Sequence, residues 1–326
     1  MEKVISTMPP PTVTDKANTR PLTAEIPVPA AITAAGKRQR RFYWLGGLLL
    51  VVLTITALWY MVPTFRHEVE AVPSTFYYFL IAGFIFAMID GAIGMSYGIT
   101  STTFSLSMGI PPASASTAVH ISEILSNAIA GWMHFKMGNV NKKLFKILLI
   151  PGITGAVLGA YLLSSLEHYS QYTKPVVSLY TLILGTIILM RAIKANRAHQ
   201  QRKGKIRKIG LLGFGGGLID AIGGGGWGSI VLSSLIAGGR HPRFSLGTVK
   251  ATRFFIAMLS SLTFVTVLSY VHWDAVLGLV IGSAIASPIA AKVSNRISAK
   301  TIMMAVAIIV ILASMKSIYG FVTKVL

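Results

Sequence analysis

The chain has 326 residues, of which 53% are hydrophobic and only 12% are charged. Soluble domains carry about 25% charged residues, so this composition excludes an ordinary water-soluble enzyme. The 30 Lys and Arg residues exceed the 10 Asp and Glu residues, but most lie in short clusters between apolar runs, a pattern typical of polytopic membrane proteins and not of nucleic-acid binding.

The N-terminal region predicts a tail followed by an anchor. Residues 1–41 have no periodic apolar pattern, and six of the fourteen prolines lie within residues 1–36, so we expect a disordered cytoplasmic tail. Residues 42–73 contain the uncharged run Phe42–Phe65. This run is long enough to cross the roughly 30 Å hydrocarbon core and has no signal-peptide cleavage site, which predicts a retained transmembrane helix.

Eight further apolar stretches follow, at 74–108, 113–135, 147–166, 175–190, 209–237, 244–271, 275–291 and 301–322. If each crossed once, basic clusters would lie on both sides of the membrane. Glycines interrupt 74–108 and 209–237, and re-entrant hairpins of two half-helices there place 21 basic residues inside and three outside. Because basic residues collect in cytoplasmic loops, we predict seven crossings and two hairpins in the cell (inner) membrane, with a cytoplasmic N-terminus.

The two hairpin segments belong to an internal repeat. A shift of 130 residues aligns Gly83–Gly98 with Gly213–Gly228 and gives six identities in sixteen positions. The repeats are 74–190 and 209–326, joined by a basic cytoplasmic linker at 191–208. Each has one hairpin and three crossings, an odd number that inverts the second copy. The fold expected is therefore all-α, with two inverted repeats of a kind common in transporters, although the repetition could also be a remnant of duplication.

The second glycine-rich segment carries a family resemblance. It reads AIGGGGWGSIVLSSLI over Ala221–Ile236, followed by Arg240-His241-Pro242 and Gly247-Thr248. It resembles the TauE/SafE-type sulfite and organosulfonate exporters, also called toluene-sulfonate uptake permeases. The first copy, Gly91–Leu106, departs from the family pattern at Met95, Ser96 and Tyr97. The resemblance covers about 74–322 and implies a dimeric secondary transporter of sulfite, sulfonates or related small anions; we expect no cofactor and no nucleic-acid partner.

The glycine-rich tips predict an anion site. Four successive glycines, Gly223–Gly226, favour unwound backbone, which is tolerated at membrane depth inside protein or beside a wet cavity. The following half-helices would direct free N–H groups towards an anion at the midplane. The predicted substrate-binding residues are Ser96, Tyr97, Thr100, Gly225, Gly226, Trp227, Gly228, Lys250 and Arg253. Alternatively, the glycines only permit close helix packing, and the hydroxyls after the first tip, which could line a passage, only bond helix carbonyls.

Ionisable residues inside the predicted spans are the candidates for coupling. They are His120, Glu123, Asp90, Asp220, Lys250 and Arg253. The repeat register places His120 opposite Lys250 and Glu123 opposite Arg253, so an inverted two-fold axis would bring the acidic and basic faces together. In one interpretation the basic pair binds the anion while Glu123 and His120 carry protons; in the other, all form internal ion pairs.

The two aspartates and the charge balance complete these expectations. Asp90 and Asp220 would bind a coupling cation or accept hydrogen bonds from the N–H groups of the opposite hairpin. Lys250 and Arg253 carry two positive charges against three negative charges on the carboxylates, and this net negative charge opposes an anion site. Anion binding then requires that a carboxylate is protonated or that the pairing leaves the basic groups free.

Alternative functions find less support in the sequence. His120-x-x-Glu123 has the spacing of a metal pair but lacks a nearby third ligand, because His134 lies about 21 Å further along a helix. No Gly-Lys-Ser/Thr step follows the glycines, as a P-loop requires. We therefore expect neither catalytic residues nor a metal. The remaining alternative is a channel-like anion pathway or a membrane-embedded interaction protein without active transport.

Overall fold

The computed structural model describes Tyr60 and residues 70–194, 208–293 and 299–325. The chain divides into two units, Met1–Ala71 and Val72–Leu326. The predicted tail, nearly all of the predicted anchor helix and most of the basic linker lie outside the described residues. The fold and the site that follow belong to the second unit.

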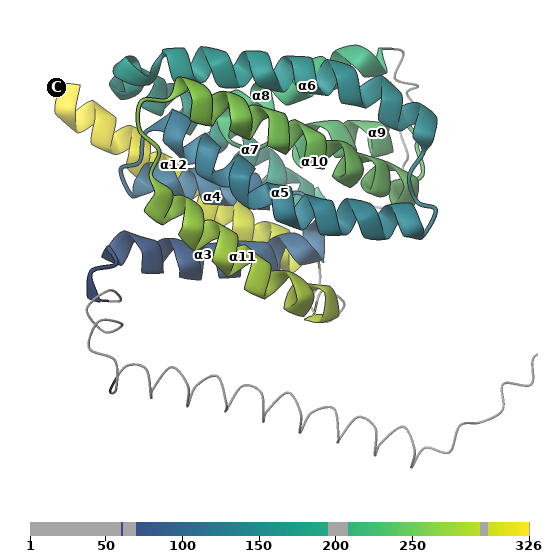
Figure 1. Cartoon of the computed structure of the whole chain (residues 1–326), viewed down its shortest axis with the longest axis horizontal. Helices are drawn as coiled ribbons and strands as arrows, with labels where there is room; N and C mark the ends of the chain where they lie inside the picture. The colour runs from purple at the N-terminus through teal and green to yellow at the C-terminus, as the bar shows by residue number, and fades with distance from the viewer. Residues whose placement is uncertain (1–59, 61–69, 195–207, 294–298, 326) are drawn as a thin grey trace, which may run out of the picture. The chain divides into compact units, whose positions relative to one another are not determined.

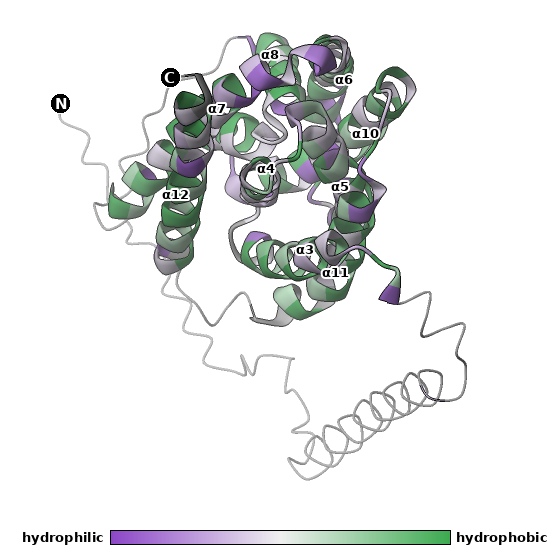
Figure 2. Ribbon diagram, turned by 90° about the vertical axis from the view of Figure 1, so that its left-hand side faces the viewer, coloured by the Kyte–Doolittle hydropathy of each residue, from purple (hydrophilic) through white to green (hydrophobic). Residues whose placement is uncertain are grey.

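The described part of this unit is built from helices alone (Figure 1). Their bounds are α3 Ser74–Ile93, α4 Tyr97–Ser107, α5 Pro112–Lys136, α6 Lys142–Ser165, η1 Glu167–Tyr169, α7 Ser170–Lys194, α8 Ile209–Gly223, η2 Gly228–Leu232, α9 Ser233–Ala237, α10 Pro242–Val267, α11 Trp273–Val293 and α12 Ala299–Val325. Among them, five stretches are long and apolar enough to cross a membrane, namely Ser74–Gly91, Lys142–Ser165, Glu167–Ile193, Pro242–Val267 and Lys300–Thr323. Hydrophobic residues run along most of the helices (Figure 2). The prediction of an all-α polytopic membrane protein is confirmed.

Both interrupted segments break at the predicted glycines. After α3 the chain turns at Gly94 with φ +79°, and after α8 it turns at Gly224 with φ +64°. This left-handed backbone is readily adopted only by glycine. The first segment differs from the expected pair of half-helices, because α3 has 20 residues and α4 has 11. The first break comes late enough that α3 alone can span a membrane.

The helices of the two predicted repeats pack reciprocally. Helix α3 lies along α11 and α8 lies along α6, while α5 packs against α10 and α7 against α12 (Figure 1). A shift of 130 residues maps α3 onto α8 and α6 onto α11, so it converts the α3–α11 pair into the α8–α6 pair. The same shift maps α5 onto α10 and α7 onto α12. Each glycine-broken segment therefore rests on a helix from the other half, and α5 and α10 meet between the two segments.

The close contact between α6 and α8 depends on glycines. A Cβ on Gly217 would collide with the carbonyl oxygen of Gly152 and lie 3.1 Å from the backbone nitrogen of Ala156. Small residues at such crossings let helix backbones approach, which supplies packing energy in a membrane. A side chain at position 217 would therefore force α6 and α8 apart.

We expect Gly217→Ala to destabilise the protein by about 1–3 kcal/mol, the usual cost of overpacking. The matched control is Gly215→Ala on the same helix, where nothing lies within 4 Å of the added Cβ. That change should stabilise the helix slightly, because alanine is the better helix former. Unfolding of the purified protein in detergent measures both; equal behaviour of the two variants would contradict the packing described.

Candidate functional site

The two glycine breaks meet backbone to backbone. A Cβ placed on Gly98, in the first turn of α4, would lie 2.9 Å from the Cα of Gly225. Two hydroxyls tie the breaks together: Thr102 donates to the carbonyl of Gly224 at 2.6 Å, and Ser229 donates to the carbonyl of Met95 at 3.0 Å. Glycine is therefore required here for close approach as well as for the turn.

Two aspartates in matching register cap the helices that follow the breaks. Asp90 Oδ1 accepts hydrogen bonds from the N–H groups of Ser96 at 2.7 Å and Tyr97 at 3.1 Å. Asp220 Oδ1 accepts one from Trp227 at 2.8 Å. Of the two alternatives for these aspartates, hydrogen bonds from the opposite hairpin are wrong: each aspartate accepts from its own segment, where the left-handed glycine turns the next helix start back towards it.

This capping also corrects the predicted source of anion binding. The N–H groups of Ser96, Tyr97 and Trp227 were expected to face an anion, but aspartate carboxylates already accept them. Buried backbone donors need partners, and a permanent carboxylate supplies one. These three N–H groups are therefore not free for an anion, and the basic side chains Lys250 and Arg253 bring positive charge to the same place.

Each aspartate also pairs with a basic group from the other half of the chain. Lys250 Nζ lies 3.3 Å from Asp90 Oδ2, and His120 Nε2 lies 3.2 Å from Asp220 Oδ2. Both pairs are related by the 130-residue shift. They differ in burial: the Lys250 and Asp90 side chains are 20% and 18% exposed, whereas His120 and Asp220 are fully buried.

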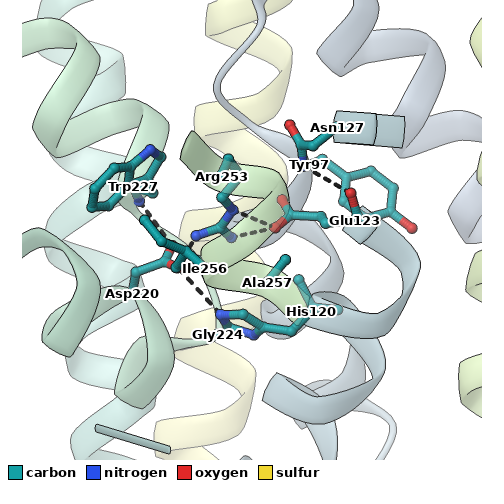
Figure 3. A network of polar contacts seen from close by, with 12 residues as sticks. Tyr97, His120, Glu123, Asn127, Asp220, Gly224, Trp227, Arg253, Ile256 and Ala257 are labelled. Carbon is teal, nitrogen blue, oxygen red and sulfur yellow. Dashed lines mark hydrogen bonds and ion pairs between the residues drawn. The ribbon is translucent and has the colours of Figure 1, made fainter. Parts of the chain in front are cut away.

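Arg253 lies between two carboxylates (Figure 3). Its Nε donates to Glu123 Oε2 at 2.7 Å, its Nη2 contacts the same oxygen, and its Nη1 contacts Asp220 Oδ2. Glu123 and Arg253 face each other across the α5–α10 contact, as the repeat register predicted. The guanidinium thus joins the first half of the chain, through Glu123, to the second glycine-broken segment, through Asp220.

His120 contacts both its own helix and Asp220. Its Nδ1 lies 2.8 Å from the carbonyl oxygen of Ser116, an acceptor only, while Nε2 faces Asp220. The Ser116 hydroxyl oxygen also lies 3.3 Å from Nδ1, so both ring nitrogens have polar neighbours inside the protein.

A small cavity opens beside these ion pairs. Its volume is about 30 Å³, which is room for about two water molecules. It is lined by eight of the residues predicted for binding or coupling, namely Asp90, Tyr97, Glu123, Gly226, Trp227, Gly228, Lys250 and Arg253. Residues far apart in the sequence, from both halves of the chain, thus meet at one cavity.

Five further lining residues were missed by the sequence analysis. They are Gly94, Met95, Gly98, Asn127 and Val249. The sequence did contain a signal that could have identified Gly98, because the 130-residue shift aligns it with Gly228, a predicted site residue. Asn127 had one too, because it lies four residues after Glu123 on the same helix face. Its Oδ1 is buried without a hydrogen-bond partner.

Several predicted site residues do not line the cavity. The Thr100 hydroxyl donates to the backbone carbonyls of Ser96 at 2.9 Å and Tyr97 at 3.0 Å. Gly225 packs against Gly98, and its carbonyl accepts the Tyr180 hydroxyl at 2.7 Å. The other predicted residues that lie outside the lining are Ser96, His120 and Asp220.

Most hydroxyls after the first tip bond the carbonyls of their own helix. This is seen for Thr100, Thr103, Ser105 and Ser107. Thr102 instead bridges to Gly224. Of the two interpretations of this hydroxyl-rich stretch, intrahelical bonding describes these residues better than a hydroxyl-lined passage.

Comparison with known proteins decides the family. The model of the family described as "Sulfite exporter TauE/SafE" matches residues 79–317, which include both glycine breaks and the whole cavity lining. The chain belongs to the TauE/SafE sulfite exporter family. The resemblance predicted from the glycine-rich segments is therefore confirmed.

A relative supports the same class of activity. The chain is 39% identical over 205 residues to the "Probable membrane transporter protein YtnM" of Bacillus subtilis (strain 168), a match that covers 60% of this chain and 66% of that protein. The match thus spans just under two thirds of the relative's length. No solved structure matches the chain. Both printed names describe transport rather than catalysis, and the five long apolar helices of the described residues agree with a multi-pass membrane protein of this family.

Proposed function

We propose that this TauE/SafE protein is a secondary transporter of small sulfur-containing anions, such as sulfite, sulfonates or related organic anions, and that it works by alternating access. The anion occupies the cavity between the two glycine breaks. One observation carries the proposal: Arg253, almost fully buried, reaches that cavity from a helix of one half while bound to Glu123 of the other.

The cavity wall offers what an oxyanion needs. A guanidinium presents a planar fork that matches two oxygens of a sulfite or sulfonate group, and Lys250 adds a point charge. The side-chain amide of Asn127 is a further polar group in the wall, held there by its donation to the backbone carbonyl of Glu123 at 2.9 Å. Tyr97 and Trp227 close the wall with rings that set the size of the group admitted.

Charge balance couples the anion to a proton. The basic groups of the cluster are already paired with its carboxylates, so an entering anion adds an uncompensated negative charge. Glu123 is the group that takes up a proton with the anion: it lines the cavity and is held by Arg253, whereas Asp220 is fully buried and contacts Trp227, His120 and Arg253. A protonated Glu123 releases the Nε edge of Arg253 to the anion, so the anion and the proton move together.

Alternating access accounts for the small cavity. A space of about 30 Å³ has room for about two water molecules, so an organosulfonate needs it to widen. The reciprocal packing of α3 on α11 and α8 on α6 supports two equivalent states in which the halves exchange roles, as in inverted-repeat transporters. On this proposal the protein is a homodimer in the inner membrane with its N-terminus in the cytoplasm.

Thermal unfolding of the purified protein tests the site. We expect sulfite, thiosulfate, taurine, sulfoacetate or an aryl sulfonate to raise the unfolding temperature, with sulfate and acetate as comparisons. A ligand at 100 times its dissociation constant adds about 2.7 kcal/mol. The stabilisation should grow as pH falls, because proton and anion bind together, and Arg253→Ala should abolish it.

Glu123→Gln separates the proton from the anion. This variant mimics the protonated carboxyl, so it should keep the anion-induced stabilisation and lose most of its dependence on pH. The proposed site would be contradicted if both proteins were folded and no anion stabilised either the unmodified protein or Glu123→Gln. Counterflow into preloaded proteoliposomes then distinguishes the carrier from a channel-like pathway, which shows none.

A further inference from the structure

A large apolar groove lies on the outer face of the α5, α6 and α10 helices. Its volume is about 610 Å³. Its walls include the rings of Trp132, Phe135, Phe145, Phe254 and Phe255. Trp132 is 60% exposed and Phe135 is 56% exposed, so these rings are open to the surroundings of the protein. Apolar, elongated chains are the partners that such walls favour.

One end of this groove is basic. Lys142 and Lys146, in the first two turns of α6, line it beside the aromatic walls. The sequence contains no Asp or Glu between Glu123 and Glu167, and none between Asp220 and Asp274. The later part of α5, all of α6 and all of α10 therefore bring no negative side chain to balance these lysines.

We propose that the groove binds an anionic phospholipid, with an acyl chain along the aromatic walls and the phosphate at Lys142 and Lys146. The loop between α5 and α6 lies on the cytoplasmic side in the predicted topology, where anionic headgroups attract basic residues. Trp132, with Lys136 Nζ 5.1 Å from its ring centroid, has the character of a residue at the membrane–water interface.

A second copy of the chain fits this face less well. Symmetric dimers use the same patch on both subunits, so an interface here would gather the lysines of both copies without an intervening acidic residue. A phosphate group instead supplies the missing negative charge. The charge pattern therefore favours the lipid over the dimer as the occupant.

The groove adjoins the central cavity. Asn127 lines both, and Phe254 directly follows Arg253 on α10. A lipid bound in the groove would contact α5 and α10, the two helices that carry Glu123 and Arg253. Its site is nevertheless separate from the anion site, and its test does not depend on transport.

Quenching by brominated lipids tests the proposal. The protein, with all tryptophans except Trp132 and the buried Trp227 changed to phenylalanine, is placed in vesicles containing phosphatidylglycerol or phosphatidylcholine brominated on the acyl chain, at equal mole fractions. We expect brominated phosphatidylglycerol to quench Trp132 more strongly. Lys142→Gln/Lys146→Gln should weaken this preference by about fivefold for each lysine.

The control is Lys143→Gln/Lys208→Gln, which removes the same charge from exposed lysines that do not line the groove; it should leave the preference intact. Equal quenching by the two lipids, or equal preferences in the two double variants, would overturn the proposal. A second copy of the chain would be the occupant instead if two results came together. Neither lipid would quench Trp132, and Ala128→Phe, a change in the groove wall, would convert a dimer to a monomer.

Discussion

Replacement of Asp220 by leucine should destabilise the protein by about 3–5 kcal/mol, the cost of leaving a buried charge without its partner. Asp220 is fully buried and accepts contacts from Trp227, His120 and Arg253. All three groups lose a partner in this variant, and a leucine side chain cannot replace it. Thermal or denaturant unfolding of the purified protein in detergent measures the loss.

Asp90→Leu is the matched control, since Asp90 occupies the same place in the first repeat. It also caps two N–H groups and pairs with a basic side chain. Because its side chain and that of Lys250 are about one fifth exposed, water can partly replace the lost contacts. A loss for Asp90→Leu as large as that for Asp220→Leu would contradict the difference in burial described for the two pairs.

Gly225→Ala should abolish transport and destabilise the protein by at least the 1–3 kcal/mol typical of overpacking. The added Cβ would lie 2.6 Å from the backbone nitrogen of Ile99, and a backbone cannot move aside as a flexible side chain can. The two breaks must then separate, which weakens the Thr102–Gly224 hydrogen bond. Anion uptake into proteoliposomes and the unfolding temperature report the two effects.

Gly320→Ala provides the control for the same substitution, because nothing lies within 4 Å of a Cβ at this position in α12. It should leave transport unchanged and stabilise the helix slightly. Transport by Gly225→Ala at the level of Gly320→Ala would show that the close approach of the two breaks is unnecessary for function.

The sequence alone determined the properties that depend on composition and spacing. Low charge and long apolar runs predicted a polytopic helical protein, and glycines located both helix breaks because positive φ is accessible mainly to glycine. The 130-residue register anticipated that Glu123 and Arg253 face each other, since both lie on helices at equivalent positions in the two halves.

Only the tertiary structure decided how the polar groups are paired. The sequence could not show that Asp90 and Asp220 cap their own segments, because that depends on the direction the chain takes after Gly94 and Gly224. The contact between Asp220 and Arg253 and the reach of Asn127 to the cavity depend on how α5, α8 and α10 pack. Hydrogen bonds select partners by distance and angle within a fraction of an ångström, and residue spacing along the chain does not specify those distances.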